Sequence, residues 1–232
     1  MAKRKSKLAI QKGLVALVGL IAISVLGYFT FLVVDDQANA RFEEGTHFET
    51  LANPRRVRGD AIEVMEFFSY GCIHCFNLEE SLEEWQSTLA DNVRFVKRPL
   101  VGSESWRMLA QHFHTLESLN ADQELHLLTF NAIHNGRKTF DSGEALARFI
   151  AENSDIEEAD YLSHWNSPRV ASELALSDRL SRQSQVASVP TLVVDGKYRV
   201  SVSRLVGPAR LFDVADFLVS QSTSGLNQAP GA

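Results

Sequence analysis

Two cysteines three residues apart are the feature of this sequence best suited to chemistry. They form the tetrapeptide Cys72-Ile73-His74-Cys75, and the chain of 232 residues contains no further cysteine. The apolar run Ile62–Phe68 precedes them and apolar residues at helical spacing follow them, so the pair falls where a predicted strand gives way to a predicted helix. Thiols at such a junction could exchange disulfides, bind a metal or form a crosslink.

The first position of a helix favours the ionised form of a thiol. Unpaired backbone N–H groups and the positive end of the helix dipole stabilise a thiolate at Cys72, and His74 adds a donor or a positive charge. Both effects lower the pKa of Cys72, whereas Cys75, one turn further on, should be buried and remain a thiol that resolves mixed disulfides. A stabilised thiolate also stabilises the reduced pair, which makes the disulfide an oxidant. The residues therefore predict a donor of disulfides.

The two other uses of the cysteines stay open but fit less well. A crosslink between Cys72 and Cys75 closes a very short loop, which removes little entropy from the unfolded chain. Zinc would need two more ligands, and the seven histidines form no recognisable spacing with the cysteines. We therefore expect no metal and no cofactor.

Two charged residues, Glu66 and Lys97, are candidates for a role beside the cysteines. Glu66 interrupts the apolar strand six residues before Cys72, and a carboxyl buried beneath the cysteines would have a raised pKa and could relay a proton to or from Cys75. The alternative is a carboxylate that faces solvent at a strand edge. Lys97 ends the next predicted strand, where it either pairs with Glu66 or is an ordinary surface lysine.

A proline begins the third predicted strand. Proline is disfavoured within a sheet except at a strand start, which fits Val189-Pro190. A cis bond there would expose the backbone of Val189 to an extended polypeptide beside the cysteines. The general preference of X-Pro bonds favours trans.

The order of predicted elements indicates an α/β fold with an all-helical insertion. A strand, a helix and a strand are followed by a long helical block, a hairpin and a closing helix, and Asp195-Gly196 is a strong signal for the hairpin turn. The expected parts are a linker and entry segment at 35–60, the two halves of the α/β unit at 61–103 and 185–221, the helical insertion at 104–184 and a flexible tail at 222–232.

The N-terminus carries a separate signal. Residues 14–34 contain no charge and are long enough to cross a bilayer, and five of the Lys/Arg lie in the basic segment 1–13, which the positive-inside rule places in the cytoplasm. The pattern at 38–40 (Ala-Asn-Ala) resembles a signal-peptidase site, so residues 14–34 are either an inner-membrane anchor or a cleaved signal. Both alternatives place the body in an extracytoplasmic space, where disulfides persist.

The charge balance excludes one class of partner. Residues 1–40 hold five Lys/Arg and two Asp/Glu, so the remaining residues hold 18 against 27, a net charge of −9 within a total of −6. A body that acidic is a poor candidate for binding nucleic acid.

Several motifs together resemble the DsbA family of thiol:disulfide oxidoreductases. They are the segment 66–75 (EFFSYGCIHC), the segment 186–191 (VASVPT) and the segment 194–198 (VDGKY), with further likeness at 42–45 and 161–167. The resemblance implies a thioredoxin fold with a helical insertion, Cys72 as the attacking sulfur, Cys75 as the resolving sulfur and Pro190 as a cis proline that faces them. It also implies that Glu66 and Lys97 are a buried charged pair.

The resemblance extends to location and partners. It implies a periplasmic oxidase of reduced proteins that a quinone-linked membrane re-oxidase, similar to DsbB, regenerates. Ile73 stands where the family usually has proline, so the disulfide is expected to be less oxidising than is usual in the family. A reductase or isomerase is the alternative enzyme, and a membrane-tethered chaperone or binding module is the alternative of another class.

An immunoblot of the native protein distinguishes the anchor from the signal. We expect a full-length protein in the membrane fraction, because 21 uncharged residues exceed the roughly 7–15 apolar residues of a usual signal peptide. A soluble product shortened by about 40 residues would contradict the anchor, because cleavage after the Ala-Asn-Ala pattern removes that length.

Overall fold

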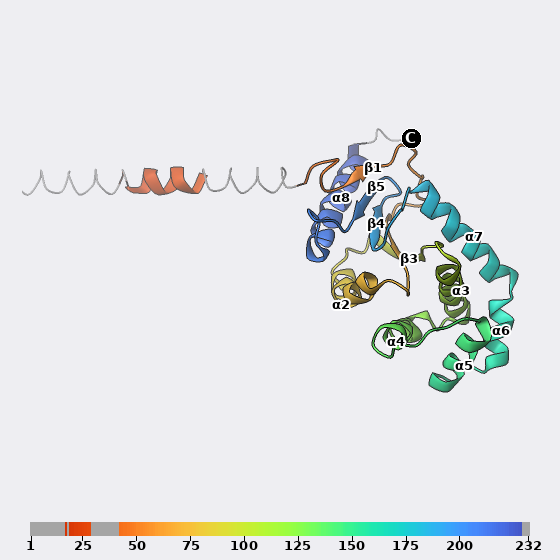
Figure 1. The fold of residues 1–232 in the computed structure, drawn as a ribbon. Helices are drawn as coiled ribbons and strands as arrows, with labels where there is room; N and C mark the ends of the chain where they lie inside the picture. The colour runs from red at the N-terminus through yellow and green to blue at the C-terminus, as the bar shows by residue number, and fades with distance from the viewer. Residues whose placement is uncertain (1–16, 18, 29–41, 229–232) are drawn as a thin grey trace, which may run out of the picture. The chain divides into compact units, whose positions relative to one another are not determined.

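The computed structural model describes residues 17, 19–28 and 42–228, without the side chains of 224–228. The chain divides into two units, 1–43 and 44–232, and Figure 1 shows the elements of each. In the first unit, residues 19–28 form a helix with exposed side chains. None of the described helices is long and apolar enough to cross a membrane. Much of the predicted span 14–34 lies outside the described residues, as do the basic segment 1–13 and the cleavage pattern at 38–40.

A five-stranded mixed sheet forms the centre of the second unit. Its order is β1-β5-β4-β2-β3, and the only parallel pair within it is β2 with β3. The strands are β1 (Glu49–Thr50), β2 (Ile62–Phe68), β3 (Val93–Pro99), β4 (Thr191–Val194) and β5 (Tyr198–Ser201). All seven residues of β2 are buried, so Glu66 lies in an interior strand of the sheet rather than at an edge.

The hairpin between β4 and β5 has the predicted turn. Asp195 and Gly196 both have positive φ, 53° and 60°, as a type I′ turn requires. A Cβ added to Gly196 would lie 2.5 Å from the carbonyl oxygen of Arg55. Glycine is therefore required at this position by both the backbone conformation and the space available.

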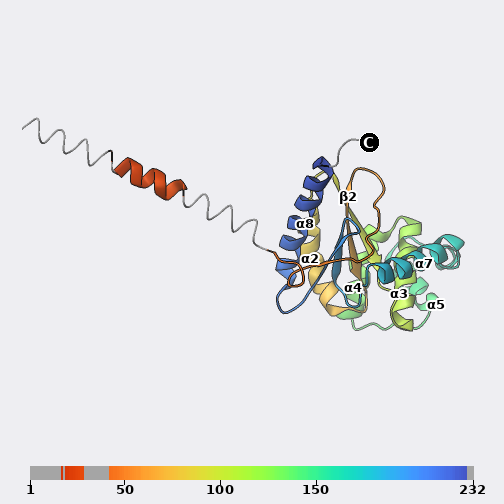
Figure 2. The ribbon, with the colours of Figure 1, turned by 90° about the horizontal axis from the view of Figure 1, so that it is seen from above.

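Helices cover both faces of the sheet (Figure 2). Helices α2 (Ile73–Ser87) and α8 (Pro208–Gln228) lie on one face, where Trp85 of α2 stacks on Phe212 of α8 with ring centroids 5.1 Å apart. On the other face, Leu180 of α7 (Pro168–Gln183) packs against Met65 and Phe67 of β2. This arrangement is a thioredoxin fold, as the family resemblance implies.

The predicted helical insertion lies between β3 and β4. It consists of α3 (Glu104–Leu119), α4 (Asp122–His134), α5 (Gly143–Asn153), α6 (Glu158–Trp165) and α7 (Pro168–Gln183). Serine hydroxyls cap three of these helices: Ser103, Ser142 and Ser167 each accept a hydrogen bond from a backbone N–H in the first turn. The first and the last helix of the insertion therefore both begin at a serine whose side chain specifies a helix start.

The C-terminal segment differs from the prediction. Helix α8 continues to Gln228, whereas the segment 222–232 was expected to be a flexible tail. The Thr223 hydroxyl donates to the carbonyl oxygen of Val219 at 3.0 Å, and Ser222 is buried. The Thr223 hydroxyl is therefore satisfied within the helix rather than in a turn, whereas the buried Ser222 hydroxyl has no hydrogen-bond partner among the described residues.

Candidate active site

Cys72 is the N-cap residue of α2. Its backbone is extended (φ −102°, ψ 112°), the helix begins at Ile73, and the Cys72 carbonyl oxygen accepts the N–H of Phe76 at 3.1 Å. The side chain of Cys72 retains 9% exposure and that of Cys75 is fully buried, and both are free thiols. Only the first sulfur is therefore placed to meet another protein, as the sequence predicts.

The two thiols have opposite acidities. The pKa of Cys72 is lowered to about 6, and the hydrogen bond with the Cys75 thiol contributes most to this. Burial acts in the opposite direction and raises the pKa. The N–H groups of Cys75 and His74 and the charge of His74 lower it further. Burial raises the pKa of Cys75 far above its ordinary value. The direction for Cys72 confirms the prediction, but the leading cause differs, because the neighbouring thiol contributes more than the exposed His74.

The Val189-Pro190 segment faces the cysteines. The Val189 carbonyl oxygen lies 3.5 Å from the sulfur of Cys72, and the Val189-Pro190 bond is cis. The general preference of X-Pro bonds predicted trans and was wrong here, whereas the family resemblance implied cis. Val189 packs against the apolar cluster that contains both cysteines.

Glu66 is a fully buried carboxyl beside Lys97. The two residues are directly opposite each other in the register of β2 and β3, and Lys97 Nζ lies 3.3 Å from Glu66 Oε2. Burial raises the pKa of Glu66 to about 7, although the positive charge of Lys97 opposes this. The predicted pairing of Glu66 with Lys97 is therefore present, and the carboxyl titrates near neutral pH.

Lys97 has closer partners that the sequence analysis did not identify. Its Nζ donates to both carboxylate oxygens of Glu79, at 2.9 and 2.7 Å, and lies 3.1 Å from His126 Nε2. Although burial disfavours the ammonium, Glu66 and Glu79 outweigh it and raise the pKa of Lys97. Burial raises the pKa of Glu79, but His126 and Lys97 outweigh burial and lower the pKa below its ordinary value. Glu79 therefore stays ionised, while Glu66 is the carboxyl whose pKa lies near neutral.

A signal for Glu79 was present in the sequence. Glu79 follows Cys75 by four residues, which places both on one face of α2, and that face is buried. His126 comes from the insertion, and no local pattern relates it to β3. A cavity of about 1330 Å³ is lined by Glu79, Lys97 and His126 and lies between α2, β3 and α4. Among the described residues, no group of three or more His, Cys, Asp or Glu could hold a metal ion.

The fold and the site together define a class of protein. A thioredoxin fold that places one acidified, slightly accessible thiol and one fully buried thiol at a helix start, opposite a cis proline, is the arrangement of a thiol:disulfide oxidoreductase. The model of the DSBA-like thioredoxin domain matches residues 100–219, more than half of the chain. The chain belongs to the DsbA family.

Individual relatives agree with this assignment. The thiol:disulfide interchange protein DsbA of Pseudomonas aeruginosa is 33% identical over 181 residues, which are 78% of this chain and 85% of that protein. The DsbA of Pseudomonas syringae pv. tomato is 30% identical over 221 residues, 94% of this chain and 100% of that protein. A crystal structure of Pseudomonas aeruginosa DsbA superimposes with a TM-score of 0.78 at 31% identity and covers 82% of this chain and 98% of that chain.

Proposed function

We propose that this oxidoreductase acts as an oxidase, which donates the Cys72–Cys75 disulfide to reduced extracytoplasmic proteins. The observation that carries the proposal is the difference in acidity between the two thiols. The pKa of Cys72 is lowered to about 6, so the reduced protein holds a stabilised thiolate at neutral pH. Because this stabilises the reduced form and makes Cys72 a good leaving group, the disulfide form transfers its bond readily.

The reaction proceeds through a mixed disulfide at Cys72. A substrate thiolate attacks the sulfur of Cys72, the Cys72–Cys75 bond breaks, and Cys75 leaves as a thiolate that takes up a proton. A second substrate thiolate then attacks the mixed disulfide, the substrate disulfide forms, and Cys72 leaves as its stabilised thiolate. The protein is left reduced and the substrate is oxidised by two electrons.

Glu66 supplies the proton that Cys75 needs. Its carboxyl has a pKa of about 7 and lies close enough for its charge to raise the pKa of Cys75. The acid form protonates the leaving thiolate of Cys75, and the carboxylate form accepts the proton when Cys75 attacks in the reverse direction. Lys97 stabilises the carboxylate at 3.3 Å, and therefore keeps the pKa of Glu66 near neutral despite burial.

Val189 and Pro190 bind the substrate chain next to Cys72. The Val189 carbonyl oxygen lies 3.5 Å from the reactive sulfur, so a substrate strand that pairs with this backbone carries its own cysteine to Cys72. Main-chain pairing does not depend on the substrate's side chains, which suits an enzyme that acts on many reduced proteins.

The remaining assignments rest on the sequence and the family. The body lies in the periplasm, held at the inner membrane through residues 14–34, with the N-terminus in the cytoplasm. A quinone-linked membrane protein similar to DsbB re-oxidises the cysteines.

Replacing Cys75 by Ala tests the proposed function. The Cys72 thiolate of this variant attacks the disulfide of an oxidised substrate and releases one substrate thiolate, and no Cys75 thiol is present to resolve the mixed disulfide. Substrates should therefore remain attached to Cys72 and appear as bands that a reductant removes on a gel. Cys72→Ser is the matched control and should form no such bands and lose oxidase activity in cells. Undiminished activity of Cys72→Ser would contradict the proposal and favour a chaperone or binding module.

Replacing Glu66 by Gln tests the proton relay. The step measured is closure of the Cys72–Cys75 disulfide from a mixed disulfide of Cys72 with glutathione. Its rate should rise with pH around 7 in the natural protein, because the Glu66 carboxylate accepts the Cys75 proton and forms as pH rises through a pKa of about 7. Glu66→Gln should lose this rise and close about tenfold or more slowly at pH 8.

The control is Glu80→Gln, which removes a carboxylate from an exposed position of the same helix α2. Its pH profile should match that of the natural protein. A Glu66→Gln variant that keeps the rise around pH 7 would show that another group takes the proton.

A further inference from the structure

In the turn before the cysteines, the peptide group between Tyr70 and Gly71 is hydrogen-bonded at both its carbonyl oxygen and its N–H. The carbonyl oxygen of Tyr70 accepts a hydrogen bond from His134 Nε2 at 2.8 Å, and the N–H of Gly71 donates to the Ser69 hydroxyl at 3.2 Å. The next N–H, that of Cys72, donates to the Ser69 carbonyl oxygen at 3.0 Å. The orientation of the Tyr70–Gly71 peptide therefore determines how the chain enters Cys72.

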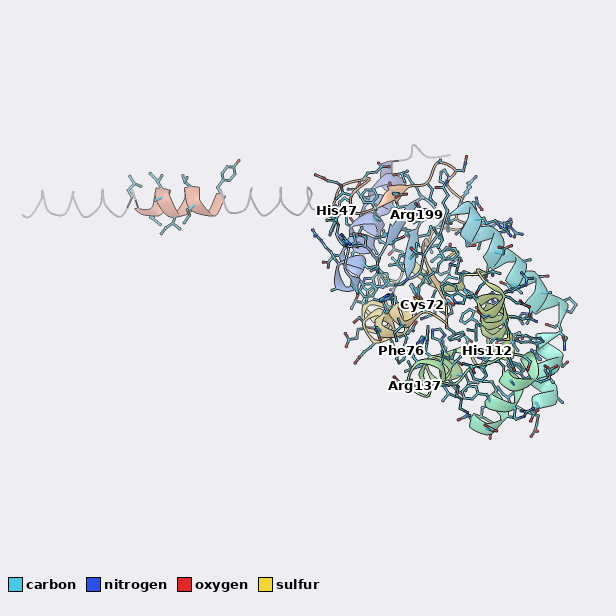
Figure 3. All side chains as sticks on the ribbon, in the orientation of Figure 1. His47, Cys72, Phe76, His112, Arg137 and Arg199 are labelled. Carbon is cyan, nitrogen blue, oxygen red and sulfur yellow. The ribbon has the colours of Figure 1, made fainter. Side chains whose placement is uncertain are left out.

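His134 also contacts the chain on the other side of the motif. Its ring stacks on that of Phe76, with centroids 5.2 Å apart and planes at 13°, and Phe76 directly follows Cys75 in the first turn of α2. Figure 3 labels Cys72 and Phe76 on the side of α2 that meets the insertion. His134 is the last residue of α4, so one residue of the insertion contacts both flanks of the Cys72–Cys75 motif.

The two contacts of His134 can be separated by chemistry. Stacking on Phe76 needs only a flat ring, which phenylalanine also supplies. The contact with Tyr70 needs an N–H, because a carbonyl oxygen only accepts, so Nε2 of His134 carries the proton. Tyr70 is 1% exposed, and its carbonyl would have little access to water if His134 were lost. A buried carbonyl without a hydrogen bond lowers the stability of the folded protein, so we expect the turn to shift until the carbonyl finds another donor.

We propose that His134 is a positioning residue that, through the Tyr70 carbonyl, holds Cys72 at the N-terminus of α2. The helical insertion thereby sets the redox properties of the cysteines in addition to covering them. This inference rests on the proposed function, because it assigns His134 an effect on the same reactive sulfur. Its physical basis is distance: the N–H groups of His74 and Cys75 stabilise the Cys72 thiolate only while the sulfur stays within their reach.

The test compares His134→Phe, which keeps a ring for stacking but has no donor, with His134→Gln, which keeps a donor but has no ring. The pKa of Cys72 is measured in each reduced protein from the ultraviolet absorbance of the thiolate across pH. The natural protein should give about 6. His134→Gln should stay close to that value, and His134→Phe should rise by about one unit, the size of a lost or weakened hydrogen bond to a charged group. The equilibrium of His134→Phe with glutathione should shift about tenfold toward the disulfide form of the protein.

Phe76→Leu is the matched control, because it removes the stacking partner and leaves the N–H of His134 in place. It should leave the pKa of Cys72 unchanged. A shift in Phe76→Leu equal to that in His134→Phe would overturn the proposal, because packing alone would then explain the effect. An unchanged pKa in a folded His134→Phe would overturn it as well.

A measurement on the natural protein covers the case in which His134→Phe does not fold. Nitrogen NMR of the histidine rings reports the tautomer of His134, and a proton on Nδ1 instead of Nε2 would overturn the proposal. The outcomes also distinguish a failure of the proposed function from a failure of the role assigned to His134. An ordinary thiol pKa for Cys72 in the natural protein would contradict the proposed function, whereas a lowered pKa that His134→Phe leaves intact would contradict this inference alone.

Discussion

The position of the Cys72 sulfur at the start of α2 lowers its pKa, and the rest of the site depends on keeping the sulfur there. The thiol of Cys75 and the N–H groups of His74 and Cys75 all favour the thiolate of Cys72, and they can do so because the helix begins immediately after Cys72. The same geometry buries Cys75 one turn further on. One helix start therefore produces both the acidic thiol to which the proposed function assigns substrate attack and the protected thiol to which it assigns resolution.

The burial of Cys75 limits which groups can lie around it. In the proposed mechanism the buried Cys75 exchanges its proton with a titrating group in the core, and Glu66 on the interior strand β2 has the burial and the pKa for that task. Burying a carboxyl without a partner would lower the free energy of unfolding. Lys97 offsets part of that cost, and Glu79 and His126 hold Lys97 in place. The charges are thus distributed so that, of the two buried carboxyls beside Lys97, Glu66 has a pKa near 7 whereas that of Glu79 is lowered.

The sequence predicted the local features well because local rules govern them. The place of Cys72 and Cys75 follows from a strand pattern next to a helix pattern, and the turn at Asp195-Gly196 follows from the need for positive φ. The partners of Lys97 were missed, since His126 lies 29 residues away and meets Lys97 only through the packing of α4 against α2 and β3. The hydrogen bond between His134 and Tyr70 spans 64 residues. No periodicity reports contacts of that kind.

In the proposed function, thiolate stabilisation makes the Cys72–Cys75 disulfide an oxidant, and the reduction potential measures this directly. The protein would be equilibrated in glutathione buffers of defined ratio and the reduced fraction determined. The account predicts a potential clearly more oxidising than that of glutathione, above about −200 mV. A value near about −270 mV, which is typical of thioredoxin, would contradict it and assign the protein to the reductases.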